Sequence, residues 1–330
     1  MILITGATGL VGSHLALYLL ENNEKIRAIY RTTASIEKTK ALFKRYNKEF
    51  LFKNIDWVQA DITDVPSLEI AFKNVKWVYH CAGLISFDPK EEEELRKINI
   101  EGTANIINFC IDYEIQKLCY VSSIATLGDL KEHETIITEE TDWNPEKFHS
   151  DYALSKYGAE MEIWRGWQEG LQSVVINPGV ILGPGFNEGG SGSIFTKVKE
   201  GLRFYTKGST GFIAIDDVVK IMVLLMKSDI NGERFIAISE NLSFKTLLKT
   251  IAFALNVKPP SIEVKPWLIN ILCQLDWLAH KLLFQKRKLS KAMNTALNSS
   301  NLISNEKTKT VLKYKFKSIE EYCNEIKDIL

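Results

Sequence analysis

The fold is decided by the first residues of the chain, Met1-Ile2-Leu3-Ile4-Thr5-Gly6-Ala7-Thr8-Gly9-Leu10-Val11-Gly12. The apolar run predicts a buried strand, and the glycines let the chain turn sharply into the helix that follows. Free N–H groups and the positive dipole end at a helix N-terminus bind phosphate. This order of strand, glycines and helix predicts a dinucleotide site, although the spacing is GxxGxxG and not GxGxxG. The alternative is a glycine turn that only packs the helix on the strand.

Short apolar runs alternate with helical patterns up to about residue 180. Six runs rich in Ile, Val, Leu and Tyr are expected to be buried strands: Met1–Thr5, Lys25–Tyr30, Ile55–Gln59, Trp77–Cys81, Lys117–Ser122 and Ser173–Asn177. Helices are expected between them: Leu10–Asn22, Ser35–Tyr46, Ser67–Phe72, Glu91–Tyr113 and Tyr152–Glu169. Because parallel strands need crossover connections, this alternation predicts a parallel sheet with helices on both faces.

The chain is too long for one small core. It has 330 residues, and a single core stops growing at roughly 250–300 residues. We expect a sheet domain over residues 1–180 and a smaller, mainly helical substrate lobe over 181–330. Short strands are expected near Phe212–Ile215 and Arg234–Ile238, and part of this lobe could return to the sheet domain.

Composition excludes several classes of protein. Lys+Arg and Asp+Glu both number 41, so no net charge attracts nucleic acid or an anionic membrane. The five cysteines are an odd number without a CxxC pair, which argues against a disulfide framework and a zinc site, and no metal is expected. The first apolar run ends at Gly6, too soon for a signal peptide. We therefore expect a cytoplasmic protein with reduced thiols.

One segment, Trp267–Phe284, resembles a membrane element. It carries polar and charged side chains such as Asp276 and Lys281, so spanning a bilayer would be costly, and no stable membrane insertion is expected. A helix with one apolar face is predicted. Burial in the second lobe, contact with a membrane surface and contact with an apolar substrate all remain open for that face.

The end of the second expected strand bears on the choice of cofactor. NAD sites usually carry an acidic residue there, which binds the ribose 2′-hydroxyl. Here the position is occupied by Arg31. A guanidinium forms paired, charge-assisted hydrogen bonds with a 2′-phosphate. NADP is therefore expected and NAD is the less favoured cofactor, unless Arg31 is only a solvated surface residue.

Tyr152 and Lys156 stand four residues apart at the start of an expected helix, so they share a face. A phenol titrates near pH ~10 and is a poor catalyst at neutral pH. A nearby ammonium lowers the pKa of the phenol, which could then exchange a proton with a substrate oxygen. The spacing alone is common, and the alternative is an ordinary amphipathic helix start.

Further motifs follow the glycine turn in a fixed order. They are Asp61-Ile62, His80-Cys81-Ala82-Gly83, Asn99-Ile100-Glu101-Gly102-Thr103, Val121-Ser122-Ser123-Ile124, Tyr152–Lys156, Asn177-Pro178-Gly179-Val180 with Gly183-Pro184, and Ile213-Ala214-Ile215-Asp216-Asp217-Val218. Almost end to end, the chain resembles the extended short-chain dehydrogenase/reductase superfamily, also called the NAD-dependent epimerase/dehydratase family. The resemblance implies a Rossmann-type doubly wound parallel sheet and an NAD(P)-dependent oxidoreductase.

The resemblance also implies roles for single residues. Ser123 would hold the substrate oxygen, Tyr152 would be the general acid/base, and Lys156 would bind the nicotinamide ribose and tune Tyr152. Asp61 and Ile62 would contact adenine. The remaining cofactor-binding positions implied are Gly6, Thr8, Gly9, Leu10, Val11, Gly12, Arg31, Cys81, Ala82, Gly83, Asn99, Pro178, Gly179 and Val180. Ser122 is the alternative serine, and His80 is expected to be a packed residue rather than a base.

Three activities remain open within this resemblance. The first is a carbonyl reductase or alcohol dehydrogenase similar to dihydroflavonol reductases and 3β-hydroxysteroid dehydrogenases, in which hydride passes from the nicotinamide to the carbonyl carbon. The second is a nucleotide-sugar epimerase or dehydratase, and the third is a nucleotide-binding sensor, which would be expected to lack the Tyr–Lys pair. Thr210-Gly211 stands where sugar-nucleotide members usually have Arg-Asp, and Leu127 where many epimerases have Tyr. These departures favour the reductase.

Bulky apolar residues of the second lobe suggest a small apolar or aromatic substrate, unless they only pack its core. They are Phe186, Phe195, Phe204, Tyr205, Trp267 and Trp277. The family resemblance further implies a homodimer built through the two long helices, Glu91–Tyr113 and Tyr152–Glu169.

Overall fold

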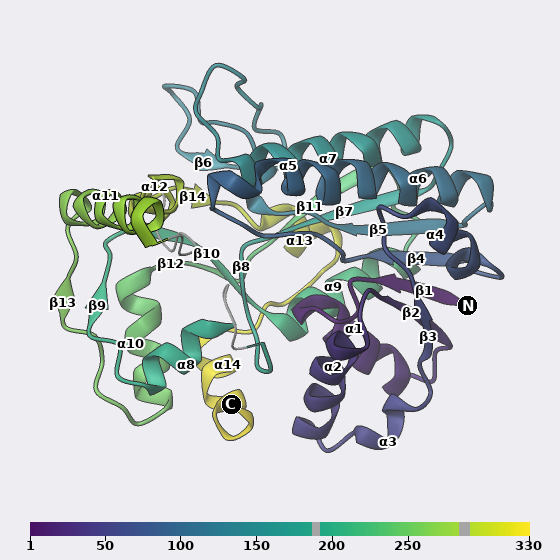
Figure 1. Ribbon diagram of the computed structural model, residues 1–330, viewed down its shortest axis with the longest axis horizontal. Helices are drawn as coiled ribbons and strands as arrows, with labels where there is room; N and C mark the ends of the chain where they lie inside the picture. The colour runs from purple at the N-terminus through teal and green to yellow at the C-terminus, as the bar shows by residue number, and fades with distance from the viewer. Residues whose placement is uncertain (187–191, 284–290) are drawn as a thin grey trace.

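A seven-stranded parallel sheet runs through the middle of the computed structural model, which describes residues 1–186, 192–283 and 291–330 (Figure 1). The strand order is β11-β7-β5-β4-β1-β2-β3. The strands are β1 Ile2–Thr5, β2 Ile26–Tyr30, β3 Asp56–Gln59, β4 Trp77–His80, β5 Lys117–Val121, β7 Ser173–Pro178 and β11 Glu233–Ala237. The order reverses between β1 and β4, and a crevice opens at such a point beyond the carboxyl ends of the strands. The prediction of a doubly wound parallel sheet is confirmed.

Helices cover both faces of the sheet (Figure 1). On one face lie α4 Val65–Phe72, α6 Gly102–Asp112 and α7 Asp151–Gln168, and on the other lie α1 Leu10–Glu21, α2 Thr33–Arg45, α3 Glu49–Phe52 and α9 Ile215–Lys227. Successive side chains of a strand point to opposite faces. Val174 and Ile176 of β7 therefore join the core under α1 and α9, while Val175 joins the core under α6 and α7. All three are fully buried, which explains why the strand is a continuous apolar run.

The seventh strand comes from the second half of the chain. β11 pairs with β7 in parallel, and Phe235 lies opposite Ile176. The sequence predicted a strand near Arg234–Ile238 but did not assign it to this sheet. The chain thus leaves the sheet after β7, builds much of the second lobe, and returns to complete the sheet.

The second lobe contains small sheets packed with helices, at the left of Figure 1. One sheet has the order β12-β10-β8, and two-stranded pairs are formed by β13 with β9 and by β14 with β6. These strands are β6 Ile136–Ile137, β8 Val180–Leu182, β9 Phe204–Tyr205, β10 Ser209–Ala214, β12 Glu240–Ser243, β13 Ile262–Glu263 and β14 Leu302–Ile303. The helices are α8 Ser193–Lys199, α10 Phe244–Ala254, α11 Pro266–Leu283, α12 Lys291–Asn298, α13 Glu306–Val311 and α14 Ile319–Ile326.

The single helix expected over Glu91–Tyr113 is interrupted. A 3-10 turn at Pro89–Glu91 leads into α5 Glu92–Leu95, and a π-helical stretch at Arg96–Glu101 then leads into α6. Such π stretches occur mostly at functional sites. Here the stretch contains Asn99, whose amide oxygen accepts the Leu84 N–H at 2.7 Å and whose amide nitrogen donates to the Leu84 carbonyl at 3.0 Å. The irregular backbone thus positions a side chain that ties down the loop after β4.

The helix predicted near Trp267 forms as α11, but most of its apolar side chains are not buried. Trp267 is 60% exposed and Leu275 is 56% exposed, whereas Ile269 and Cys273 are buried.

Of the aromatic residues expected to face a substrate, Phe195 and Tyr205 instead belong to the core, and the Trp277 side chain lies outside the described residues. Among the described residues, none of the helices has both the length and the apolar character needed to cross a bilayer.

Candidate active site

The glycine turn closes tightly between β1 and α1. Gly6 adopts a φ of +66°, which favours glycine, and the Gly9 N–H donates to the Gly6 carbonyl at 3.0 Å. A Cβ on Gly12 would lie 2.3 Å from the Gly6 carbonyl oxygen, so only glycine lets α1 approach the turn. No side chain caps the N-terminus of α1 and its first turn has no acidic residue. The N–H groups of the helix therefore face the crevice as phosphate donors.

Arg31 follows β2, the neighbour of β1, and its side chain is exposed. The next residues, Thr32 and Thr33, begin α2, and no side chain caps this helix end. Thr39 of α2 donates to the Ala7 carbonyl at 3.0 Å, which fixes α2 against the glycine turn. An exposed guanidinium thus stands beside a second helix N-terminus at the edge of the crevice, a suitable place for a phosphate group.

Asp61 and Ile62 follow β3 at the same edge of the sheet. One carboxylate oxygen of Asp61 accepts the Thr63 N–H at 2.9 Å and the Thr63 hydroxyl at 2.8 Å. Ile62 is buried, and a Cβ on Gly102 would lie only 2.6 Å from its Cδ1. The position of the Asp61–Ile62 backbone is therefore set by packing against α6.

The segment after β4 lies against the glycine turn. The Ala82 N–H donates to Thr5 Oγ1 at 3.1 Å, and a Cβ on Gly6 would lie 2.6 Å from the Ala82 nitrogen. A Cβ on Gly83 would lie 3.8 Å from Lys156 Nζ. The structure thus brings the Lys156 ammonium beside the loop that continues from Cys81 and Ala82.

Ser123 begins a 3-10 turn, Ile124–Thr126, at the carboxyl end of β5. Its Oγ accepts the Ala125 N–H at 3.1 Å, and its hydroxyl lies near enough to Tyr152 of α7 to lower the pKa of that phenol. Tyr152 is half-buried and lies 5.9 Å, between ring centroids, from Phe87 of the loop after β4. Ser123 and Tyr152 thus present two hydroxyl groups to one place, beside an aromatic ring.

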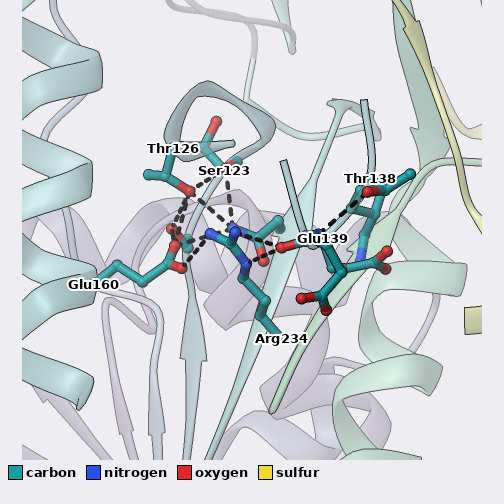
Figure 2. Close-up of polar contacts among 10 residues, drawn as sticks. Ser123, Thr126, Thr138, Glu139, Glu160 and Arg234 are labelled. Atoms are coloured by element: carbon teal, nitrogen blue, oxygen red, sulfur yellow. Dashed lines mark hydrogen bonds and ion pairs between the residues drawn. The ribbon is translucent and has the colours of Figure 1, made fainter. Parts of the chain in front are cut away.

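A buried carboxylate holds the Ser123 turn in place (Figure 2). Glu160 Oε2 accepts the hydroxyls of Ser122 at 2.6 Å and Thr126 at 2.8 Å, and it accepts Asn177 Nδ2 at 3.0 Å. Its other oxygen lies 3.3 Å from Arg234 Nη1 of β11. Ser122, the alternative serine of the sequence analysis, is therefore a structural partner of Glu160.

Arg234 also anchors the segment that precedes α7. Its Nε donates to the Glu139 carbonyl at 2.8 Å, and its Nη2 donates to the same oxygen (Figure 2). The Glu139 carboxylate in turn accepts the Ile236 N–H at 2.8 Å. The last strand of the sheet thus ties together the Ser123 turn, α7 and the chain between them.

Lys156 lies one helical turn beyond Tyr152 and is buried. Its ammonium donates to the Tyr120 hydroxyl at 2.6 Å and to the Val121 carbonyl at 2.7 Å. Burial lowers the pKa of Lys156 to about 7, against the opposing effect of Glu160. Burial also raises the pKa of Tyr152, and the Ser123 hydrogen bond only partly offsets this. This direction is opposite to the one expected from a neighbouring ammonium.

The segment after β7 is held by close backbone contacts. The Gly179 N–H donates to the Ala237 carbonyl at 3.0 Å, and a Cβ on Gly179 would lie 2.2 Å from the Gly211 carbonyl oxygen. Pro178 ends β7 and Val180 begins β8. All three predicted residues therefore lie at the carboxyl edge of the sheet, next to β5 and Ser123.

Three residues of the site were not found from the sequence. Glu160 had a signal, because it follows Tyr152 and Lys156 at the spacing of one helix face. Tyr120 stands within an apolar strand, and Arg234 comes from β11, so no local pattern pointed to either. His80 is buried as expected, and its ring bonds to the side chains of Thr5 and Thr103.

Together, the glycine turn at a helix N-terminus, the hydroxyls of Ser123 and Tyr152, and the Lys156 ammonium beside Gly83 are the arrangement expected of a dinucleotide-dependent enzyme of the oxidoreductase class. The sequence pattern of the NAD dependent epimerase/dehydratase family matches residues 2–237. The chain belongs to this family, whose members bind NAD(P), and is an NAD(P)-dependent enzyme of the extended short-chain dehydrogenase/reductase type.

Known proteins similar to the chain differ in activity. Sterol demethylase protein B of Methylococcus capsulatus is 24% identical over 292 residues, which cover 86% of this chain and 84% of that protein. A putative dihydroflavonol 4-reductase of Synechocystis sp. is 27% identical over 272 residues, covering 80% and 75%. The structure of a Thermotoga maritima UDP-glucose 4-epimerase with UDP-glucose matches with a TM-score of 0.77 at 20% identity, covering 98% of this chain and 96% of that one.

Proposed function

We propose that the chain is an NADP(H)-dependent oxidoreductase. It reduces the carbonyl group of a small apolar or aromatic substrate, or oxidises the corresponding alcohol. The observation that carries the proposal is the approach of the Ser123 hydroxyl to Tyr152, one helical turn before Lys156, whose ammonium lies beside Gly83. Two hydroxyls that converge in this way can hold one substrate oxygen between them.

Each residue has a defined part in the reduction. NADPH, when bound, supplies the hydride that reduces the carbonyl carbon. Ser123 donates a hydrogen bond to the carbonyl oxygen, and Tyr152 gives its proton to the same oxygen as negative charge develops there. The raised pKa of Tyr152 keeps the phenol protonated, so it enters the reaction as an acid. The Lys156 ammonium stabilises the phenolate that remains.

Arg31 supports the choice of NADP over NAD. Its exposed guanidinium beside the uncapped start of α2 suits the 2′-phosphate, which only NADP carries. We expect Arg31→Met to weaken NADPH binding by about tenfold or more and to leave NADH binding nearly unchanged. Fluorescence titration of the wild type and of Arg31→Met, each with NADPH and with NADH, measures these affinities. Equal loss for the two nucleotides, or tighter NADH binding by the wild type, would contradict the assignment.

The loop after β4 supports an apolar substrate. Phe87 lies against the Tyr152 ring, and Ile85 of the same loop is exposed. The alternative is a nucleotide-sugar enzyme. Such enzymes usually carry an Arg-Asp pair at the positions where this chain has Thr210-Gly211. A Cβ on Gly211 would lie 2.5 Å from Ile238 Cγ2, so no longer side chain fits there without movement. We expect no binding of UDP-glucose in a titration that detects NADPH.

The catalytic assignment is tested with Tyr152→Phe, which removes only the phenolic oxygen. NADPH affinity should stay at the wild-type value, while turnover on a panel of aldehydes and ketones falls by a factor on the order of 10²–10⁴. NADPH absorbance follows the turnover. A variant that turns over substrate as fast as the wild type would remove Tyr152 from the mechanism.

We further propose a cytoplasmic homodimer, with the dimer formed through α6 and α7. Leu154, Met161 and Trp167 are exposed apolar side chains of α7, and a partner's helices could cover them. Light scattering coupled to gel filtration should give twice the chain mass for the wild type and the monomer mass for Leu154→Glu with Met161→Glu. A monomeric wild type would refute the dimer.

A further inference from the structure

A chain of buried hydrogen bonds extends behind Lys156, away from the substrate. Lys156 Nζ donates to the Tyr120 hydroxyl at 2.6 Å, and the Tyr120 ring stacks on the His80 ring. Thr103 Oγ1 lies 3.0 Å from His80 Nε2, and His80 Nδ1 lies 2.6 Å from Thr5 Oγ1. All five side chains are buried, so water does not replace any of these bonds.

This chain joins the two halves of the site. Thr5 ends β1 directly before Gly6, and its hydroxyl also accepts the Ala82 N–H. Hydrogen bonds and the stacked rings of Tyr120 and His80 therefore connect the Lys156 ammonium to the glycine turn after β1. The His80 ring also stacks on the Tyr120 ring at 5.3 Å between centroids, which fixes both rings.

We propose that Tyr120 is a positioning residue, which aims the Lys156 ammonium at the cofactor ribose and at Tyr152, and that Thr103, His80 and Thr5 hold Tyr120 in turn. The inference rests on the proposed function for the role of Lys156. Tyr120 itself touches neither substrate nor cofactor in this scheme. It acts only through Lys156.

The need for such a residue follows from burial. An ammonium has three donors and no acceptor, and a buried one must find a partner for each. Tyr120 and the Val121 carbonyl take two donors of Lys156, and a Cβ on Gly83 would lie 3.8 Å from the same ammonium nitrogen. The ammonium also lies 4.3 Å from the centroid of the Tyr120 ring. A four-carbon side chain that is free to rotate is thereby held in one position.

His80 suits the end of this chain because it is neutral. Burial lowers the pKa of His80 to about 3, and the Lys156 charge adds to this effect. A neutral imidazole donates from one nitrogen and accepts at the other. It can therefore accept from Thr103 while it donates to Thr5, or donate to Thr103 while it accepts from Thr5.

Tyr120→Phe tests the proposal, because it removes one oxygen and keeps the ring that packs on His80. We expect NADPH affinity, measured by fluorescence titration, to weaken by about 3–10-fold, the loss typical of one hydrogen bond. We also expect the pH dependence of NADPH binding to move to lower pH, because the ammonium loses an acceptor. The charged and titratable groups around Lys156 are Glu160 and Tyr152 on α7, His80 and Cys81 at the end of β4, and Tyr120 on β5. All but Tyr120 are unchanged in the variant.

Two comparisons separate positioning from a general loss of structure. Tyr79→Phe is the matched control, because Tyr79 is equally buried on the adjacent strand β4 and faces the opposite core, so NADPH binding should not change. In a Lys156→Met background, Tyr120→Phe should have no further effect on NADPH affinity, since both changes act through one ammonium.

Additive losses in the double variant, or unchanged NADPH affinity and pH dependence in Tyr120→Phe, would overturn the proposal. Binding is measured without turnover. A chain that binds NADPH but reduces no carbonyl compound would therefore refute the proposed function and still give a result for Tyr120.

Discussion

Replacing Glu160 by Gln should destabilise the fold strongly, although the two side chains have nearly the same shape. Glu160 is fully buried. One carboxylate oxygen accepts hydrogen bonds from Ser122, Thr126 and Asn177, and the other forms an ion pair with Arg234. Arg234 and the Asn177 amide nitrogen can only donate, whereas the hydroxyls of Ser122 and Thr126 can also accept. A glutamine has one acceptor oxygen, so its NH₂ group must face either the guanidinium or the Asn177 amide nitrogen, and neither accepts a hydrogen bond.

The magnitude follows from these contacts. The change leaves the Arg234 charge without its counter-ion and puts a donor against a donor at a side chain that is fully buried. Breaking a buried ion pair by removing one partner costs about 3–5 kcal/mol. Because the free energy of unfolding of a protein is about 5–15 kcal/mol in all, this is a large fraction of it. Glu160 also raises the pKa of Lys156, so that pKa should fall in the variant.

Urea unfolding followed by circular dichroism measures the loss of free energy. Glu162→Gln is the control, because Glu162 lies on the same helix but pairs with Arg165 at the surface, where such a pair contributes about 0–1 kcal/mol. Glu160→Gln should also lower the turnover rate. Its partners Ser122 and Thr126 flank Ser123, so the position of Ser123 depends on them. The reasoning is wrong if both variants unfold at the same urea concentration.

Two further predictions concern pH and the glycine turn. Burial lowers the pKa of His14 to about 4, whereas in the unfolded chain this histidine titrates near pH 6.5. Below about pH 6.5 the unfolded state therefore binds more protons than the folded state, and the free energy of unfolding decreases as the pH decreases. The loss of unfolding free energy at pH 5, relative to pH 7.5, is about 2 kcal/mol. Urea unfolding at both pH values should show that the unfolding free energy of His14→Gln depends less on pH by this amount. An identical pH dependence in the wild type and the variant would contradict this. Gly12→Ala should weaken NADPH binding by about tenfold or more and lower stability by about 1–3 kcal/mol, because its Cβ would lie 2.3 Å from the Gly6 carbonyl oxygen. Fluorescence titration and urea unfolding measure these losses, and wild-type values in both would show that the turn can relax.

Most of the sheet could be predicted from the sequence, because strands buried on both faces must be apolar runs. β4, β5 and β7 begin at the predicted residues, and every bound of the six predicted strands lies within one residue of its prediction. β11 was harder to place, because nothing local distinguishes a strand of the main sheet from one of the second lobe. The π-helical stretch at Arg96–Glu101 was missed because hydrophobic periodicity is insensitive to one extra residue in a turn.

In the candidate site, too, some residues could be predicted from the sequence and others could not. Gly6, Tyr152 and Lys156 stand in contiguous motifs, so a sequence displays them directly. Tyr120, Glu160 and Arg234 matter through contacts between distant parts of the chain, which only the folded arrangement provides. The pKa direction for Tyr152 was also wrong, because charge proximity can be read from spacing whereas desolvation depends on what packs around the ring.

The late position of β11 in the chain has a consequence for biosynthesis. When a ribosome has released the chain only as far as β7, that strand has an open edge, and Arg234 has yet to be synthesised. The nucleotide-binding half is therefore incomplete until more than fifty further residues have been made. Gene fusions or transplants that carry the first half alone would deliver an exposed strand edge and an uncompensated carboxylate.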